Sequence, residues 1–286
     1  LLAQLAGIPG LALVVALRGG QRPFGPTWGE PVHAGPLDPE SARSAFLAVP
    51  GERFQDDPDL DPLLLALDGL ALAVDLLASQ AEGEPDLSML RMRWEQRRTA
   101  VLRRASGRES QESLEVSLGL SIESPRMTEG GRRLLSILGL LPDGVARGDL
   151  EALLPGSGAE AASVLRKVGL VFDQGSRLRM LAPVREHVRQ CHPPTGEDFD
   201  RTVDHYLALA RLGEKIGSEE GAEAARRLRA DMGNLEPMIQ AGLERADPIP
   251  AICSALAHAE AVRFTGIGGP TLLGRARQAA REASRK

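Results

Sequence analysis

The chain opens on an apolar pattern that is typical of a buried strand. Residues 11–17 read LALVVAL, an unbroken apolar run with two valines, which suits a strand covered on both faces in a parallel sheet. A loop rich in glycine and proline follows, and VHAG at 32–35 predicts one more strand. Two strands do not make a stable sheet alone, so we expect residues 1–35 to end a larger α/β domain and the chain to be a fragment.

From residue 36 the apolar positions follow a helical period. A helix is predicted to begin at Asp38 or Pro39. Its inner side is expected to carry Ala42, Phe46 and either Leu47 or Val49. The stretches DPDLDPLLLAL and GLALAVDLLASQA predict two short buried helices, and the arginine-rich DLSMLRMRWEQRRTAVLRRASG predicts a longer amphipathic one. Residues 36–108 are therefore expected to form a helical subdomain.

Residues 109–195 predict several helices followed by a hairpin, which is the pattern of a winged helix. Leu114, Leu118 and Ile122 recur at helical spacing before Pro125, and EGGRRLLSILGLLPDGV predicts a buried helix. Two short helices follow, and LVFDQGSRLRML predicts a hairpin that turns at Asp-Gln-Gly-Ser. PVREHVRQCH then predicts a helix with proline in its first turn.

Residues 196–286 predict helices in antiparallel pairs, like the opening of an α-solenoid of the tetratricopeptide kind. Asn234 and Pro237 interrupt the second of the three long helical stretches, so we expect two helices there. The fold class expected for the whole chain is mainly α, with a remnant of an α/β sheet, a helical subdomain, a winged helix and a solenoid-like tail.

Composition narrows the function classes. The net charge is −5, which argues against a protein whose main task is to wrap nucleic acid. Cys191 and Cys253 lie far apart and give no disulfide framework, which favours a reducing compartment. No apolar stretch approaches the roughly 20 residues that span a bilayer, so we expect a cytoplasmic protein without a membrane segment.

The order of these pieces resembles the NB-ARC class of STAND NTPases, the nucleotide switches of plant immune receptors and the apoptosis scaffold. LALVVALRGG is similar to the family's sensor strand, whose terminal arginine reads the γ-phosphate, here Arg18. GLALA at 69–73 is similar to the Gly-Leu-Pro-Leu-Ala motif that packs against adenine, with Gly69 and Leu70 matching and Ala71 in place of proline. RLRMLAPVREHV resembles the winged-helix segment that carries Met-His-Asp. The resemblance implies that residues 1–35 end a nucleotide-binding domain and that the parent protein binds ADP or ATP.

The sequence departs from the family's motifs at the positions that contact the phosphates of the nucleotide. Met180 matches, but Leu181 and Ala182 replace the histidine and aspartate, and leucine cannot donate the hydrogen bond that the histidine gives to ADP. No G-x-x-x-x-G-K-[ST] loop occurs in the sequence. We therefore expect this chain to bind no cofactor, to be no enzyme and to hold no nucleotide tightly. Leu181 is expected to close an apolar seam with the segments of Arg18 and Gly69.

Gly69 and Arg18 each keep a plain structural interpretation. Gly69 can serve only as a C-cap of the preceding helix, or it can keep the backbone open where an adenine approaches. A basic residue such as Arg18 is also common at a strand end.

Other polar groups are weaker candidates. His187 and Cys191 share a helix face but lack a second pair of metal ligands, so ordinary surface residues are the better interpretation. Seven arginines recur on one predicted helix, where a solvated face or an interdomain ion-pair surface is favoured over phosphate contacts: Arg91, Arg93, Arg97, Arg98, Arg103, Arg104 and Arg108.

Two function classes follow. The first is a regulatory fragment of a STAND-type switch that acts in signal transduction. Its helical tail binds protein partners, and the full-length protein can oligomerise. The second is a winged-helix transcription regulator or a degenerate interaction scaffold. The helix expected to enter a DNA groove carries only Arg166 and Lys167, and the wing only Arg177 and Arg179, so DNA is the less favoured partner.

Overall fold

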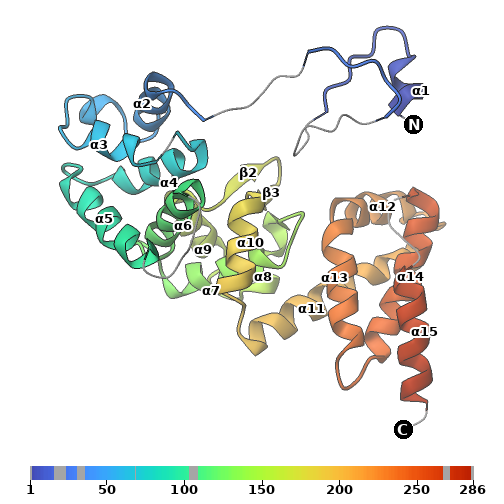
Figure 1. The fold of residues 1–286 in the computed structure, drawn as a ribbon. Helices are drawn as coiled ribbons and strands as arrows, with labels where there is room; N and C mark the ends of the chain where they lie inside the picture. Colours follow the sequence, from blue (N-terminus) through green and yellow to red (C-terminus); the bar gives the residue numbers. More distant parts are fainter. Residues whose placement is uncertain are drawn as a thin grey trace. The chain divides into compact units, whose positions relative to one another are not determined.

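The structure is a computed structural model that describes residues 2–15, 24–30, 36–67, 69–102, 109–266 and 271–284. These residues form 15 α-helices and one three-stranded sheet, so the prediction of a mainly α protein is confirmed (Figure 1). The chain divides into two compact units, Leu1–Pro36 and Leu37–Lys286.

The first unit contains the short helix α1 (Leu2–Ala6) and no strand among its described residues. Residues 11–15 have no regular secondary structure, and Val14 is 96% exposed. The predicted buried strand is therefore wrong over these residues, and none of the described residues of this unit forms a strand that could pair with it. The rest of that stretch, with Arg18, and the predicted strand at 32–35 lie outside the described residues.

The second unit begins with a group of helices around a core of their own. The elements are α2 (Pro39–Leu47), the 3-10 turn η1 (Glu52–Phe54), α3 (Leu60–Leu65), α4 (Ala71–Ala81), α5 (Ser88–Leu102) and α6 (Glu109–Ile122). Helix α2 begins as predicted: the Asp38 carboxylate accepts a hydrogen bond of 2.8 Å from the backbone N–H of Ser41. Phe46, Leu60 and Trp94 are buried together in this core.

Helix α6 belongs to this group by its packing. It lies against α4 and α5, and Val116 on α6 is fully buried in their shared core. The predicted boundary at residue 109 falls between α5 and α6 and so separates α6 from the helices on which it packs. The linker before α7 is where the chain leaves the group.

The segment that the sequence predicts as a winged helix follows, and it contains the predicted hairpin; the name winged helix is kept below for this segment, Glu129–Cys191. Its elements are α7 (Glu129–Gly139), β1 (Val145–Ala146), the 3-10 turn η2 (Arg147–Asp149), α8 (Leu150–Leu153), α9 (Gly158–Lys167), β2 (Phe172–Gln174), β3 (Arg177–Arg179) and α10 (Ala182–Cys191). The antiparallel strands lie in the order β1–β3–β2, with Leu178 opposite both Val145 and Asp173. Gly175, at φ +59°, turns the hairpin.

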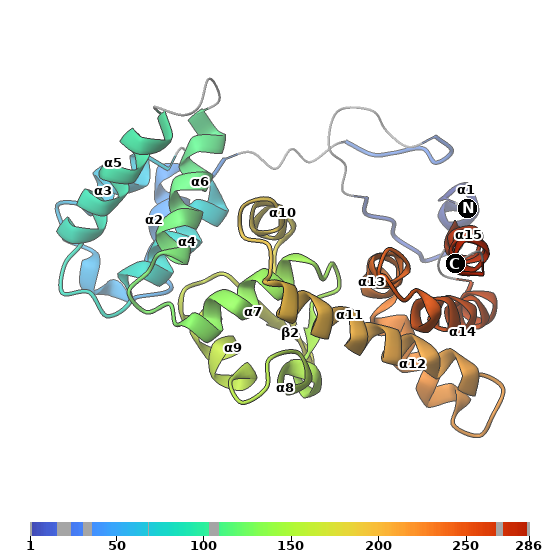
Figure 2. The ribbon, with the colours of Figure 1, turned by 90° about the horizontal axis from the view of Figure 1, so that it is seen from below.

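The helical tail runs from residue 196. It consists of α11 (Gly196–Ala210), the 3-10 turn η3 (Arg211–Lys215), α12 (Gly221–Ala230), α13 (Met232–Leu243), α14 (Ile249–Thr265) and α15 (Thr271–Ala283). Figure 2 shows α11 leading from the winged helix into the tail. The expected break in the second helical stretch is present, but it falls at Asp231; Asn234 and Pro237 both lie inside α13.

One hydrophobic core runs through the winged helix and the tail. Leu138 and Leu178 of the winged helix and Tyr206 and Leu235 of the tail belong to the same buried cluster. Leu76 on α4 joins this cluster from the first helices. The second unit is therefore held together by apolar contacts that cross the predicted domain boundaries.

Candidate functional site

A cavity of about 860 Å³ lies between α2, α3 and the turn before α4. Its walls are formed by Leu37, Pro39, Glu40, Ala42, Arg43, Asp61, Pro62, Leu64, Leu65 and Gly69. Small-molecule sites commonly measure about 300–1,000 Å³ and are mostly apolar with a few polar groups, and this cavity fits both criteria.

Gly69 forms part of this cavity through a turn that its backbone makes possible. Its φ is +67°, a left-handed conformation that costs other residues about 1–2 kcal/mol. The turn is fixed because Leu37 donates a hydrogen bond of 2.8 Å to the carbonyl of Gly69. Helix α3 ends at Leu65 with Ala66 as its C-cap, so the interpretation of Gly69 as a plain helix cap is wrong.

Leu70 and Ala71 follow Gly69 at the start of α4. Leu70 is the N-cap of α4 and packs partly against the core of the helical group, while Ala71 is exposed. The helix behind them is buried on most sides, as its apolar sequence predicts, because α2 and α6 both pack on it.

Charged groups stand at the rim of the cavity. Arg43 donates to the Asp61 carboxylate and to the carbonyl of Gln55, which fixes the guanidinium there. The carboxylates of Glu40 and Asp61 can accept hydrogen bonds from amino groups of a ligand, and Arg43 can donate them. An apolar cavity with such a rim suits a flat, nitrogen-rich ring.

Leu181 does not lie where its predicted role requires. It is 43% exposed, whereas the preceding Met180 is only 6% exposed. Leu178 and Met180 alternate inward along the extended segment, so Leu181 points to the solvent side. The prediction that Leu181 closes an apolar seam with Gly69 is wrong.

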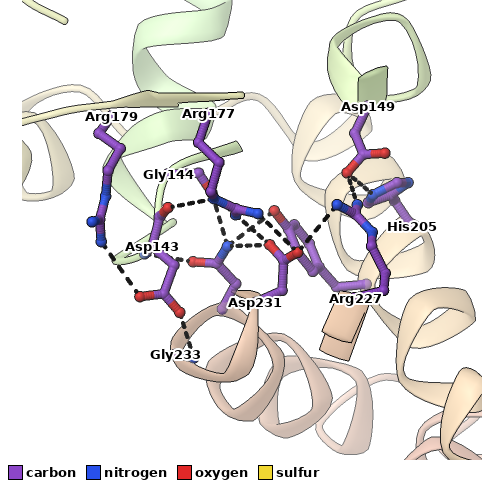
Figure 3. Close-up of polar contacts among 11 residues, drawn as sticks. Asp143, Gly144, Asp149, Arg177, Arg179, His205, Arg227, Asp231 and Gly233 are labelled. Atoms are coloured by element: carbon purple, nitrogen blue, oxygen red, sulfur yellow. Dashed lines mark hydrogen bonds and ion pairs between the residues drawn. The ribbon is translucent and has the colours of Figure 1, made fainter. Parts of the chain in front are cut away.

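A buried polar network joins the winged helix to the tail instead (Figure 3). Arg177 on β3 donates to both carboxylate oxygens of Asp231, at 2.5 and 3.1 Å, and to the carbonyls of Asp143 and Gly144, both at 3.0 Å. Asp231 lies between α12 and α13 and is fully buried. Burial opposes the charge on Arg177, but the hydrogen bond to Asp231 and the nearby negative charge together outweigh it and raise the Arg177 pKa.

Asn234 completes the network one turn further along α13. Its side-chain oxygen accepts from the backbone N–H of Asp143 at 2.9 Å, and its amide donates to the Gly144 carbonyl at 2.8 Å. Asp143 in turn accepts from the N–H of Gly233 at 2.6 Å. Burial raises the pKa of Tyr206, whose hydroxyl accepts from the Asn234 amide at 3.2 Å. The loop before β1 and the start of α13 are thus stitched together by backbone and side-chain bonds.

Two more carboxylates tie the same parts together. Asp149 of η2 pairs with Arg227 on α12 and lies 3.6 Å from His205 on α11. Burial opposes its ionisation, yet the contacts with His205 and Arg227 lower the pKa of Asp149. Asp198 on α11, 1% exposed, accepts from Arg133 on α7 at 2.6 and 2.8 Å, and this bidentate contact lowers its pKa.

Sequence reasoning missed this junction, the set of polar contacts by which Arg177, Asp143, Asp149 and Arg133 of the winged helix bind the tail. Arg177 was considered only as a wing residue of the less favoured DNA-binding alternative, and Asn234 was an expected helix break, whereas both face the junction. The available signal was the pair Asp231 and Asn234, three residues apart at the start of an otherwise apolar helix.

Other predicted candidates have structural partners. Three arginines of α5 bond to acidic residues: Arg91 to Asp59, Arg93 to Glu84 and Arg97 to Glu123. The predicted candidates Arg103, Arg104 and Arg108 lie outside the described residues. His187 lies 5.9 Å from His192 between ring centres, and the described residues contain no group of three or more metal-binding side chains. None of the described helices has the length and apolar character needed to cross a membrane.

Comparison of the chain with protein-family models, curated proteins and solved structures gives no match.

Proposed function

We propose that the chain is the regulatory part of a STAND-type nucleotide switch in a signal-transduction protein. In this proposal the helical group supplies the base-facing side of an ADP or ATP site. The phosphates are held by a loop that these 286 residues do not contain. The winged helix and tail move together and present the tail to protein partners.

The observation that carries the proposal is the cavity at Gly69. Its size lies within the range of small-molecule sites, its walls are largely apolar, and its rim offers both donors and acceptors. Gly69, the residue that resembles the start of the family's adenine-contacting motif, lines this cavity.

The junction supports the second half of the proposal. Asp231 and Asp198 are buried carboxylates on the tail, and each is paired with an arginine of the winged helix. Separating the two parts would take the winged-helix arginine away from each buried carboxylate and leave only its partner within the tail, Arg201 for Asp198 at 3.0 Å and Arg227 for Asp231 at 3.5 Å, which is costly in a buried setting. The two parts are therefore expected to move as one body.

Ion pairs within the chain count against the DNA-binding alternative. Arg166 on α9 pairs with Asp173 at 2.9 Å, and Arg177 of the wing pairs with Asp231. Arg179 lies 3.6 Å from Asp143. Because these arginines are already neutralised, the electrostatic attraction for phosphates at this surface is weak.

Ligand-observed NMR with adenosine and with ADP tests the proposal on the chain as it stands. We expect adenosine to show weak saturation transfer, and ADP to bind no more tightly, because no phosphate loop is present. Calorimetry should detect no micromolar binding of ATP or ADP. A micromolar dissociation constant, or the absence of any adenosine signal, would contradict the proposal.

Gly69→Leu provides the matched variant. A side chain there should abolish the adenosine signal while circular dichroism stays that of a folded protein. Gly83→Leu is the control, because Gly83 also has positive φ, at +90°, and a Cβ placed there meets nothing within 4 Å. Equal signals from wild type and Gly69→Leu would remove the cavity from the proposal.

A further inference from the structure

A small cavity between α14 and α15 contains a buried histidine without a hydrogen-bond partner. The cavity measures about 170 Å³ and is lined by Ala255, His258, Ala259, Val262, Arg263, Leu272 and Leu273. His258 is only 1% exposed, and neither of its ring nitrogens has a partner among the described residues. A buried imidazole left unbonded costs free energy, so a group that enters the cavity and bonds to it would be stabilised.

The surface around the cavity is apolar. Leu273, which lines the cavity, is 40% exposed. Leu256 lies two turns before Arg263 on the same side of α14 and is 58% exposed. Such a grouping on one hairpin is larger than the single exposed apolar residues common on surfaces.

The same face is basic, although the chain as a whole is acidic. Arg277 and Arg281 follow Leu273 at intervals of four residues, so all three lie along one side of α15. Both arginines are exposed, and among the described residues neither has an ion-pair partner. Arg263 is paired with Glu260, at 2.8 Å.

We propose that this α14–α15 face binds an acidic amphipathic helix of a partner protein. Leucine and two carboxylates at four-residue intervals on that helix would match Leu273, Arg277 and Arg281, because successive turns rise about 5.4 Å on both helices. In this arrangement an apolar side chain of the partner helix covers Leu256 and Leu273. A carboxylate or carbonyl oxygen of the partner accepts a hydrogen bond from the His258 imidazole. The inference does not depend on the nucleotide cavity at Gly69.

Fluorescence anisotropy with a labelled synthetic helix tests this on the full chain. The probe has leucine and two glutamates at four-residue intervals; the comparison peptide has lysine in place of glutamate. We expect the glutamate peptide to bind, its affinity to fall with added salt, and the lysine peptide not to bind. No binding of the glutamate peptide, or equal binding of both peptides, overturns the proposal.

Charge-reversal variants locate the contact. Arg277→Glu together with Arg281→Glu should weaken binding at least about tenfold. Arg275→Glu is the matched control, because Arg275 is exposed on the same helix but on the opposite side from Leu273 and Arg277. Equal effects of the double variant and the control would contradict the assignment.

Two further readouts test whether a partner helix occupies this face. Nitrogen chemical shifts of the His258 ring should change on peptide addition, which a purely structural histidine would not show. Sedimentation should show that the chain does not self-associate through this face. Self-association that the double variant abolishes would make a second copy of the chain the occupant and would overturn the proposal.

Discussion

The Arg177 guanidinium donates hydrogen bonds to the Asp231 carboxylate and to the carbonyls of Asp143 and Gly144. The side chain is 14% exposed and that of Asp231 is fully buried. At such a site the pair itself adds little net stability, but the loss of Arg177 leaves the buried Asp231 carboxylate with Arg227, at 3.5 Å, and the Asn234 amide, at 2.9 Å, as its polar partners. The stability of the junction is therefore expected to depend strongly on Arg177.

Arg177→Met should lower the free energy of unfolding by about 3–5 kcal/mol. Urea denaturation followed by circular dichroism measures it. Arg179→Met is the control, because Arg179 is a neighbouring wing arginine with a partly exposed partner at 3.6 Å. Its loss should cost no more than about 1 kcal/mol. Similar losses in both variants would show that the buried pair is not what holds the junction.

His258 predicts a pH dependence of stability. Burial lowers its pKa below the ordinary value of 6.5, with Glu236 acting in the opposite direction. The unfolded chain then binds a proton more readily than the folded one as the pH falls below 6.5, so stability is lost in that direction.

His258→Leu should reduce the loss of melting temperature between pH 7 and pH 5. At pH 7 the variant should be about as stable as the parent, because the ring it removes has no partner among the described residues. Asp198, whose pKa is lowered from the ordinary value of 3.8, loses its contribution to stability only below that pH, so it does not affect the comparison between pH 7 and pH 5. Identical pH profiles for parent and variant would refute this assignment.

At the scale of elements, the three-stranded sheet is the part that positions the junction. Strand β1 has two residues, yet it pairs with β3 and sets the loop that carries Asp143 and Gly144 against α13. Gly144 has φ +66°, and a Cβ there would lie 2.2 Å from the Leu178 carbonyl oxygen. Only glycine fits so close to the neighbouring strand.

Gly144→Ala should therefore destabilise the chain more than Gly175→Ala. Both glycines have positive φ, but a Cβ at Gly175 meets nothing within 4 Å, so only the backbone strain of about 1–2 kcal/mol remains there. Thermal unfolding of the two variants gives the comparison. Equal losses would mean that β1 shifts away at little cost and does not fix the junction.

The sequence predicted helices and the hairpin correctly where a capping or turn residue stood next to a matching apolar pattern. Asp38 with Pro39 marked the start of α2, and the Gly-Ser turn marked the hairpin. It failed over residues 11–15, because a continuous apolar run predicts burial without saying what covers it. Strand β1 was also missed, since two residues carry no detectable period.

At the scale of the whole molecule, one core runs through the winged helix and the tail. Sequence patterns gave these parts separately, but their contacts come from residues far apart in the chain, such as Arg177 and Asp231. The cavity at Gly69 was predictable in part, because the motif marked the turn, while its walls from α2 and α3 required the packed structure. The role of Leu181 could not be read from its motif, since alternation along the extended segment decides which way it points.

Photolabelling with an azido derivative of adenosine tests the nucleotide-switch proposal most directly. After irradiation, mass spectrometry of the digested chain locates the label. The proposal predicts labelling within residues 37–43 and 61–70, competed by adenosine and lost in Gly69→Leu. Labelling elsewhere, or labelling that adenosine does not compete, would contradict it.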